Sequence, residues 1–177
     1  HREVLDQGID LIVSDHLAEI APDKVTLSSG KEIPCDAVVM ACGILPETEL
    51  AEKANLTIGE TGGIKVNHNY LTNDKDIYAI GDAIEVYHNL LEAPTLLALA
   101  GPAQRQARAV ADHINGRTIR QKGYIGSSVI QLFDYNAAST GLTEKMIADN
   151  DLSLTYDYSL VIPFDKVGLM PGAAPIF

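Results

Sequence analysis

The chain is poor in cysteine and in positive charge, and both shortages limit its function. Its two cysteines, Cys35 and Cys42, are too few for a disulfide scaffold and too far apart for a CxxC redox pair or a zinc knuckle, so we expect two buried apolar thiols. Its 13 lysines and arginines stand against 24 acidic residues, which gives a net charge of −11. Nucleic-acid binding and attraction to anionic membranes both need clustered positive charge, so we expect neither partner.

Long hydrophobic runs are also missing. No run approaches the roughly 20 apolar residues of a membrane helix, and the first residues lack the basic region and apolar core of a signal peptide. We therefore expect no membrane contact and a cytoplasmic location. Hydrophobic residues still make up 46% of the chain, enough for a packed core. Because the chain starts at His1 without a methionine and stops within the apolar residues 175–177, we expect a piece of a longer protein.

Short elements are predicted in the first third of the chain. Ile9–Val13 and Lys24–Leu27 have the composition of strands in a small antiparallel meander. Ala37–Ala41 is an unbroken apolar run, typical of a strand buried on both faces. Glu47–Ala54 predicts a short helix, and Ile64–Asn67 alternates as a half-buried strand.

The stretch TNDKDIYAIGD, residues 72–82, combines a strand, a glycine and a carboxylate. Ile77–Ile80 predicts a strand buried on both faces, and Gly81 permits another group to approach the backbone closely. Asp82 would then lie just beyond the carboxyl end of a parallel strand, where open α/β sheets bind ligands, and its carboxylate can accept hydrogen bonds from sugar-like hydroxyls. The alternative is an ordinary strand-to-loop turn with aspartate as the turn former.

A loop is expected after Asp82, over Ala83–Pro94. It contains Glu85, His88 and Glu92, whose spacing matches no usual metal site, so we expect solvated side chains and no metal.

A helix is predicted over Thr95–Asn115, where apolar residues recur at helical spacing. This apolar stripe consists of Ala103, Ala107, Val110, Ala111 and Ile114. Because Pro102 cannot donate to the carbonyl of Ala98, the helix is either kinked there or regular only from about Gly101, and we favour the kinked helix.

The last third changes element type. The residues around 123–128, rich in glycine and serine, indicate a domain boundary near residue 120. Val129–Phe133 and Asn136–Gly141 predict a hairpin, Thr143 is a candidate cap of a following short helix, and Leu152–Leu160 alternates as another strand.

Three segments in this order resemble the FAD-dependent pyridine nucleotide-disulfide oxidoreductases. The stretch 72–82 resembles the family's second flavin-binding motif, and LALAGPAQRQAR, residues 97–108, resembles its L-A-x-x-A-x-R-Q-G-R helix, with Ala107 where glycine is usual. FDYNAASTGLTE, residues 133–144, resembles the start of its interface domain. A fourth segment, ACGILP at 41–46, carries a weaker signal. It resembles the segment through which the chain of family members passes from the NAD-binding domain back to the FAD domain.

The resemblance implies roles for five residues. Gly81 and Asp82 would bind FAD, with the aspartate on the ribityl chain. Ala98, Leu99 and Ala100 would lie against the flavin ring, where the free N–H groups and positive end of a helix stabilise the negative charge of the reduced flavin. Without the resemblance, these small residues would only indicate close helix packing.

The implied fold is α/β, with the C-terminal parts of two Rossmann-like domains followed by an α+β interface domain. Residues 1–45 would end the NAD(P)-binding domain, 46–120 would close the FAD-binding domain, and 121–177 would begin an interface domain that pairs two subunits in a homodimer. The resemblance reaches Pro171-Gly172-Ala173, but Leu169-Met170 replaces the Tyr-Tyr of coenzyme A-disulfide reductases, where one tyrosine assists the coenzyme A chemistry.

No G-x-G sequence occurs in the chain, so it has neither of the family's two G-x-G-x-x-G phosphate loops. The family's catalytic cysteine lies near the N-terminus of its members, so no catalytic residue is assigned here. The resemblance implies a parent enzyme that passes hydride from NAD(P)H through FAD to a small-molecule acceptor: a disulfide, peroxide or oxygen. The alternative is a nucleotide-binding or dimerisation module without redox activity of its own.

Overall fold

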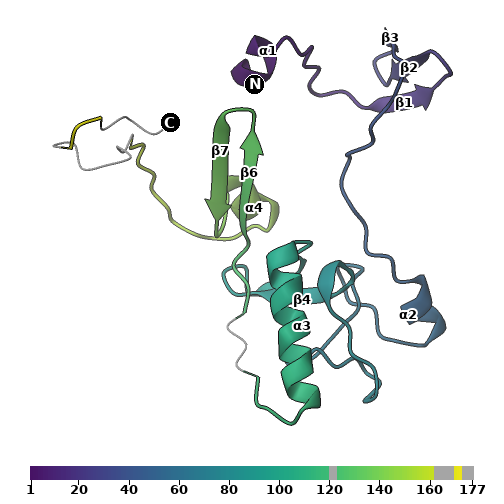
Figure 1. The fold of residues 1–177 in the computed structure, drawn as a ribbon, viewed down its shortest axis with the longest axis vertical. Coiled ribbons are helices and arrows are strands. Elements are labelled where there is room, and N and C mark those ends of the chain that lie inside the picture. The colour runs from purple at the N-terminus through teal and green to yellow at the C-terminus, as the bar shows by residue number, and fades with distance from the viewer. Residues whose placement is uncertain (120–122, 162–169, 173–177) are drawn as a thin grey trace. The chain divides into compact units, whose positions relative to one another are not determined.

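The computed structural model of the protein describes residues 1–119, 123–161 and 170–172. The chain divides into two compact units, His1–Ile44 and Leu45–Phe177, which Figure 1 traces in sequence order. The assignment of residues 1–45, 46–120 and 121–177 to three functional domains stays a prediction. The boundary expected near residue 120 falls on 120–122, and the residues Leu169 and Ala173 of the C-terminal resemblance also lie outside the described residues.

The first unit contains a helix and a small sheet. The helix α1 spans Arg2–Asp6, and the strands β1 (Leu17–Ile20), β2 (Lys24–Leu27) and β3 (Glu32–Pro34) pair antiparallel in the order β1-β2-β3. The predicted meander is confirmed in part: the strand at Lys24–Leu27 has the observed bounds, but its partners are β1 and β3.

Three predictions in this unit are wrong. Ile9–Val13 and Ala37–Ala41 form no strand, and Val39 in the second segment is 89% exposed. A strand needs a hydrogen-bonded neighbour, and none of the described residues pairs with either segment. Both cysteines are free, but Cys42 is exposed and Cys35 only half-buried, so the prediction of two buried thiols is the third that is wrong.

Asp15 ties the segment before β1 to the turn after β2. Its carboxylate accepts hydrogen bonds from the hydroxyls of Ser28 at 2.5 Å and Ser29 at 2.6 Å, and from the backbone N–H groups of His16 and Ser29. The Ser28 hydroxyl, followed by the Ser29 hydroxyl, holds the pKa of the Asp15 carboxyl well below its usual range. The ionised carboxylate is therefore part of the folded form of this unit.

Replacing Asp15 with asparagine should remove an acid-sensitive contribution to the stability of the first unit. Because the folded pKa of Asp15 is depressed, its stabilisation is complete above about pH 4, the ordinary aspartate pKa, and is lost as the pH falls below it. Hydrogen exchange of the Ser29 amide, followed from neutral to acidic pH, should show acid-dependent loss of protection in the native sequence and a lower, flatter profile in Asp15→Asn. Equal acid sensitivity of the two proteins would contradict this role.

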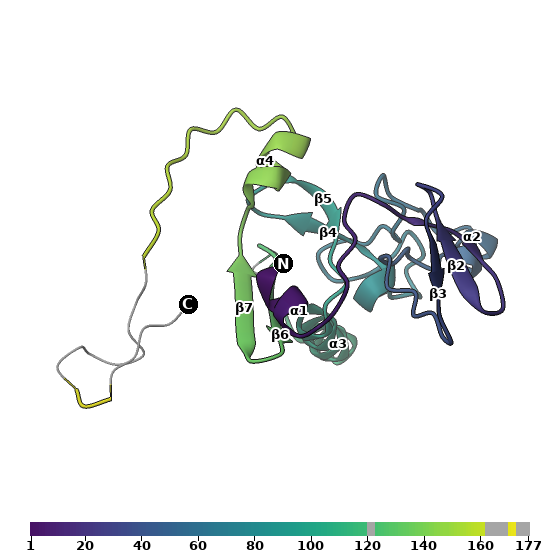
Figure 2. The same ribbon diagram turned by 90° about the horizontal axis from the view of Figure 1, so that it is seen from above.

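The second unit contains the remaining elements. They are the helices α2 (Glu49–Lys53), α3 (Ala100–Ile114) and α4 (Glu144–Asp149), the 3-10 turn η1 (Gly81–Ala83), and the strands β4 (Glu85–His88), β5 (Ala93–Leu96), β6 (Ser127–Leu132) and β7 (Tyr135–Thr140). The strands form two antiparallel hairpins, β4-β5 and β6-β7, which Figure 2 shows from above.

The core of this unit gathers around β4. Its buried members are Ala51, Ile64, Tyr70, Ile84, Val86 and Tyr124. Ala109 and Val110 of α3 pack against this cluster from the helix side. A parallel bridge between Ile64 and Ile84 joins the segment before the 72–82 stretch to the residue that follows η1. The core therefore supports η1 directly.

The hairpin and short helix predicted in the last third are confirmed. A turn of two residues, Phe133 and Asp134, joins β6 and β7, and the Thr143 hydroxyl accepts a hydrogen bond of 3.2 Å from the Met146 N–H at the start of α4. The strand predicted at Leu152–Leu160 is wrong, because no described segment pairs with it. The loop predicted over Ala83–Pro94 is also wrong, since its residues form β4 and the first half of β5, where Tyr87↔Pro94 and His88↔Ala93 are paired.

Candidate functional site

The Gly81–Asp82 turn is the centre of the candidate site. Gly81 has a φ of 82°, a conformation that L-residues with a side chain rarely adopt, and it begins η1 directly after the extended residue Ile80. The backbone N–H of Gly81 donates a 2.6 Å hydrogen bond to Oε1 of Gln106 in α3. Asp82 is exposed at this turn. The turn is thus anchored to the helix while the carboxylate stays accessible.

The strand predicted before this turn is not formed. Ile77–Ile80 is an extended segment whose one bridge among the described residues is antiparallel, between Tyr78 and Leu71. It is half-buried rather than buried on both faces, and Ile80 is 38% exposed. The neighbours of a parallel strand come from distant parts of the chain, and no described residue pairs in parallel with Ile77–Ile80.

Helix α3 begins five residues later than predicted. Thr95 belongs to β5, Leu99 is the N-cap, and Ala100 is the first helical residue. Pro102 lies in the first turn, where backbone N–H groups have no partner within the helix, so its missing N–H costs no helical hydrogen bond. The predicted kinked helix that starts near Thr95 is therefore wrong, and the alternative, a regular helix from about Gly101, is the better description.

The three residues predicted to face a flavin lie at this helix start. Ala98 and Leu99 are half-buried, and Ala100 is exposed. The N–H groups of Ala100 and Gly101 have no acceptor within the helix, and its first turn contains no acidic residue. This end of α3 therefore carries the uncancelled positive end of a 15-residue helix dipole.

A cavity of about 540 Å³ lies beside the start of α3. Its wall includes Leu99, Ala100 and Arg105 of the helix region and residues from 123 to 130. Asp82, Gly81 and Ala98 do not line it. The structure therefore brings two of the five predicted site residues to one cavity and ties the Gly81–Asp82 turn to the same helix through Gln106.

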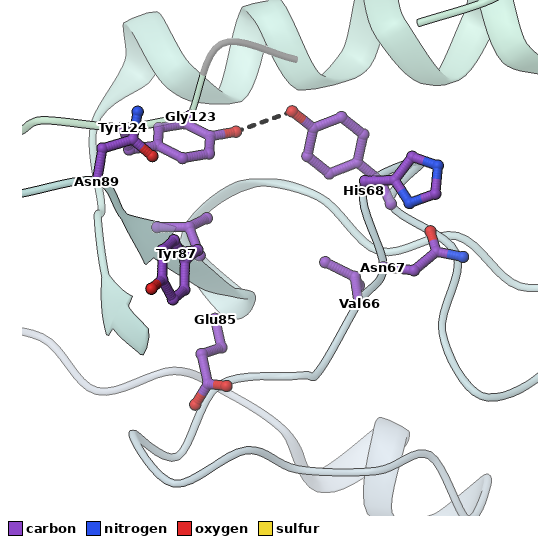
Figure 3. A pocket seen from close by; sticks show the side chains of 10 residues that line it. Val66, Asn67, His68, Glu85, Tyr87, Asn89, Gly123 and Tyr124 are labelled. Atoms are coloured by element: carbon purple, nitrogen blue, oxygen red, sulfur yellow. Dashed lines mark hydrogen bonds between the residues drawn. The ribbon is translucent and has the colours of Figure 1, made fainter. Parts of the chain in front are cut away.

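Gln106 is the site residue that sequence reasoning missed. It is 1% exposed, and its Nε2 donates a 3.0 Å hydrogen bond to the hydroxyl of Tyr124, which in turn lies 2.9 Å from the hydroxyl of Tyr70 (dashed line in Figure 3). Its position, three residues after Ala103 and four before Val110, was a usable signal, because that spacing places a polar residue within the apolar stripe.

The apolar stripe itself was partly misassigned. The buried residues of α3 are Pro102 and Gln106, whereas Ala107 and Ala111 are exposed and Ile114 is 65% exposed. The face of α3 that packs inward is set by its contacts with η1 and with the core cluster, which helical spacing alone does not identify.

A second cavity, of about 390 Å³, is lined from β4 and the 66–70 segment (Figure 3). Glu85 lies in its wall and is 8% exposed, and its Oε2 accepts hydrogen bonds from the N–H and hydroxyl of Thr61 at 3.0 and 2.9 Å. These bonds give Glu85 a structural role in closing the turn at residues 59–63.

The described residues contain neither a metal-binding cluster nor a membrane-spanning helix. Within residues 1–119, 123–161 and 170–172, no three His, Cys, Asp or Glu side chains come together in an arrangement that could hold a metal ion. Nδ1 of His88, one of the three candidates in sequence, instead accepts from the N–H groups of Leu90 and Leu91. None of the helices in these ranges has the length and apolar character needed to cross a bilayer.

Comparison with known families decides the class of protein. The model of the family described as pyridine nucleotide-disulphide oxidoreductase matches residues 1–107, more than half of the chain. The chain belongs to this family. Membership confirms the resemblance seen in the ordered motifs, and the described α/β content agrees with a pyridine nucleotide-disulphide oxidoreductase.

Three relatives match nearly the whole chain. Coenzyme A disulfide reductase of Staphylococcus epidermidis is 30% identical over 175 residues, which is 98% of this chain and 39% of that protein. Reduced Bacillus anthracis CoADR-RHD has a TM-score of 0.90 and 39% identity, covering 99% of this chain and 32% of that one. A NAD-dependent persulfide reductase from A. fulgidus has a TM-score of 0.87 and 32% identity, covering 98% and 32%. This chain thus spans about two fifths of the curated relative's length.

Proposed function

We propose that the chain is part of a flavoprotein NAD(P)H oxidoreductase, in which Gly81 and Asp82 bind the ribityl chain of FAD. The observation that carries this proposal is the anchored turn: Gly81 is held by Gln106, and the Asp82 carboxylate that follows is exposed. An exposed carboxylate on a fixed backbone can accept hydrogen bonds from the hydroxyls of a polyol chain without first breaking a buried contact.

The start of α3 suits the flavin ring. When bound, FAD supplies the chemistry of hydride acceptance and release. Ala98 and Ala100 would present small side chains and Leu99 an apolar one, beside the free N–H groups of the helix end, which stabilise negative charge close by. The cavity of about 540 Å³ beside Leu99 and Ala100 offers space next to these groups.

The electron donor in this proposal is NAD(P)H, and the acceptor is a small molecule: a disulfide, peroxide or oxygen. The names of the relatives at 30% identity or more, a coenzyme A disulfide reductase and a persulfide reductase, favour a sulfur–sulfur acceptor. Catalytic residues are not assigned to this chain. Cys35 and Cys42 belong to the His1–Ile44 unit, whereas the candidate FAD residues belong to the second.

A homodimer and a cytoplasmic location complete the proposal. Every residue of β6 and β7 is exposed, including Val129 at 71% and Ile130 at 61%. A two-stranded hairpin is marginal by itself, and apolar residues exposed on it are typical of a surface that pairs with another chain. This supports an interface domain that begins near the hairpin.

Replacing Asp82 with alanine in the full-length protein should weaken FAD binding. A hydrogen bond to a charged group contributes about 1.5–3 kcal/mol, so we expect a loss of affinity of roughly 10- to 100-fold. FAD titration followed by flavin fluorescence measures the affinity, and the visible flavin band of the purified protein reports its occupancy. Asp76→Ala is the matched control, because Asp76 is an exposed acid of the same stretch, paired with Lys75, and should leave FAD affinity unchanged.

Two further results separate this proposal from its alternatives. A full-length protein that is colourless and takes up no FAD contradicts it and leaves a nucleotide-binding or dimerisation module. Residues 1–177 alone should bind FAD weakly or not at all, because no G-x-G phosphate loop is present in them. Tight stoichiometric uptake by these residues would place the whole FAD site within this chain.

A further inference from the structure

We propose that Gln106 is a positioning residue for FAD binding: it holds the Gly81–Asp82 turn with one side of its amide and ties it to Tyr124 with the other. The inference rests on the proposed function of that turn. It concerns a side chain on α3 that is 1% exposed and that no cofactor would touch directly at this depth.

The contacts form a continuous chain within the second unit. Gly81 N–H donates to Gln106 Oε1 at 2.6 Å, Gln106 Nε2 donates to the Tyr124 hydroxyl at 3.0 Å, and that hydroxyl lies 2.9 Å from the hydroxyl of Tyr70. Tyr70 and Tyr124 are 4% and 8% exposed. A buried hydrogen-bonded chain is strengthened by the low local dielectric, and each member constrains the next.

The orientation of the Gln106 amide follows from its partners. A backbone N–H can only donate, so the group facing Gly81 must be the carbonyl oxygen, and the NH₂ group then faces Tyr124. An apolar side chain of the same length would fill this place in the core without the cost of burying an amide. The amide is therefore explained by the two bonds it makes and not by packing alone.

The anchored atom controls the direction of the functional carboxylate. Gly81 is at φ 82°, and its nitrogen is the first atom of η1, so the backbone torsions that follow carry the Asp82 side chain outward. Without the bond to Gln106, a glycine can adopt many other conformations, because it has no side chain to restrict it. FAD would then have to order the turn when it binds, and affinity would fall by that cost.

The test compares three variants in the full-length protein. Gln106→Met keeps the length of the side chain but removes both hydrogen bonds, Gln106→Glu keeps an oxygen for Gly81, and Tyr124→Phe removes only the outer partner. We expect Gln106→Met to weaken FAD binding about tenfold, and Gln106→Glu and Tyr124→Phe to stay within about threefold of the native protein. The melting temperature of the FAD-free protein is measured in parallel.

We expect FAD affinity and melting temperature to respond differently to these variants. Tyr124→Phe and Gln106→Met should both lower the melting temperature, because each leaves a buried polar group unpaired. Only Gln106→Met should also reduce the affinity for FAD about tenfold. A native protein that binds FAD together with a Gln106→Met variant of unchanged affinity overturns the positioning role and leaves the proposed function intact. A native protein that binds no FAD overturns the proposed function itself.

Folding failure does not remove the test. If Gln106→Met does not fold, Gln106→Leu decides, because it also lacks the oxygen that accepts from Gly81. A loss of about tenfold in FAD affinity with an intact fold supports the positioning role, and affinity within about threefold of the native protein overturns it.

Discussion

Replacing Ile84 with alanine should lower the free energy of unfolding of the protein by about 2–5 kcal/mol, the usual cost of truncating a large buried aliphatic side chain. Ile84 is 1% exposed and is the largest fully buried apolar side chain of the core cluster in the described residues. It follows η1 directly, and its backbone is bridged to Ile64. The cavity would therefore open beneath the Gly81–Asp82 turn.

Urea unfolding of the two proteins measures this loss. Ile114→Ala is the matched control, because Ile114 lies in the last turn of α3 and is 65% exposed, so its truncation removes little packing and introduces a better helix former. We expect the control to stay within about 0.5 kcal/mol of the native protein. An Ile84→Ala protein as stable as the control would mean that the core around β4 is not packed as described.

Replacing Gly63 with alanine should also be strongly destabilising, by about 1–3 kcal/mol, for the opposite reason: it adds atoms where there is no room. A Cβ on Gly63 would lie 2.7 Å from the backbone nitrogen of Glu85 and 2.8 Å from the carbonyl carbon of Ile84. Both neighbours are backbone atoms held by the hydrogen bonds from Ile64 N to Ala83 O and from Glu85 N to Ile64 O. The strain must therefore be relieved by moving the Ile64–Ile84 bridge.

Gly101→Ala is the control for Gly63→Ala. A Cβ on Gly101 would lie 3.6 Å from the Arg105 guanidinium, an ordinary contact, and alanine is favoured over glycine in a helix by up to about 1 kcal/mol. Thermal unfolding should show a lower melting temperature for Gly63→Ala and an equal or higher one for Gly101→Ala. Equal melting temperatures for the two variants would contradict the close approach at Gly63.

Predictions based on local signals agreed well with the structure. Lys24–Leu27 was predicted with its observed bounds, because turn residues flank it and its partners lie directly before and after it in sequence. Thr143 was predicted as a helix cap, and its hydroxyl accepts from Met146 as a cap does. The family was predicted from the order of three motifs, and the match over residues 1–107 confirms it.

Predictions that needed distant partners were less successful. Ala37–Ala41 and Leu152–Leu160 have strand composition but form no strand, since strand pairing depends on residues that composition does not reveal. The five predicted FAD residues, Gly81, Asp82 and Ala98–Ala100, stay predictions. The structure adds to them the anchor at Gln106, which links the turn to the helix.

The sequence by itself determined the family and the short-range elements, because ordered motifs, caps and turns depend on residues within a few positions of one another. Only the tertiary structure decided where α3 begins and which of its faces is buried. The pairing of Thr95 and Leu96 with β4 keeps these residues out of the helix, and contacts with η1 and the core cluster set its buried face. The two hydrogen-bond partners of the buried Gln106 amide, Gly81 and Tyr124, lie 25 and 18 positions away and are revealed only when the chain is folded.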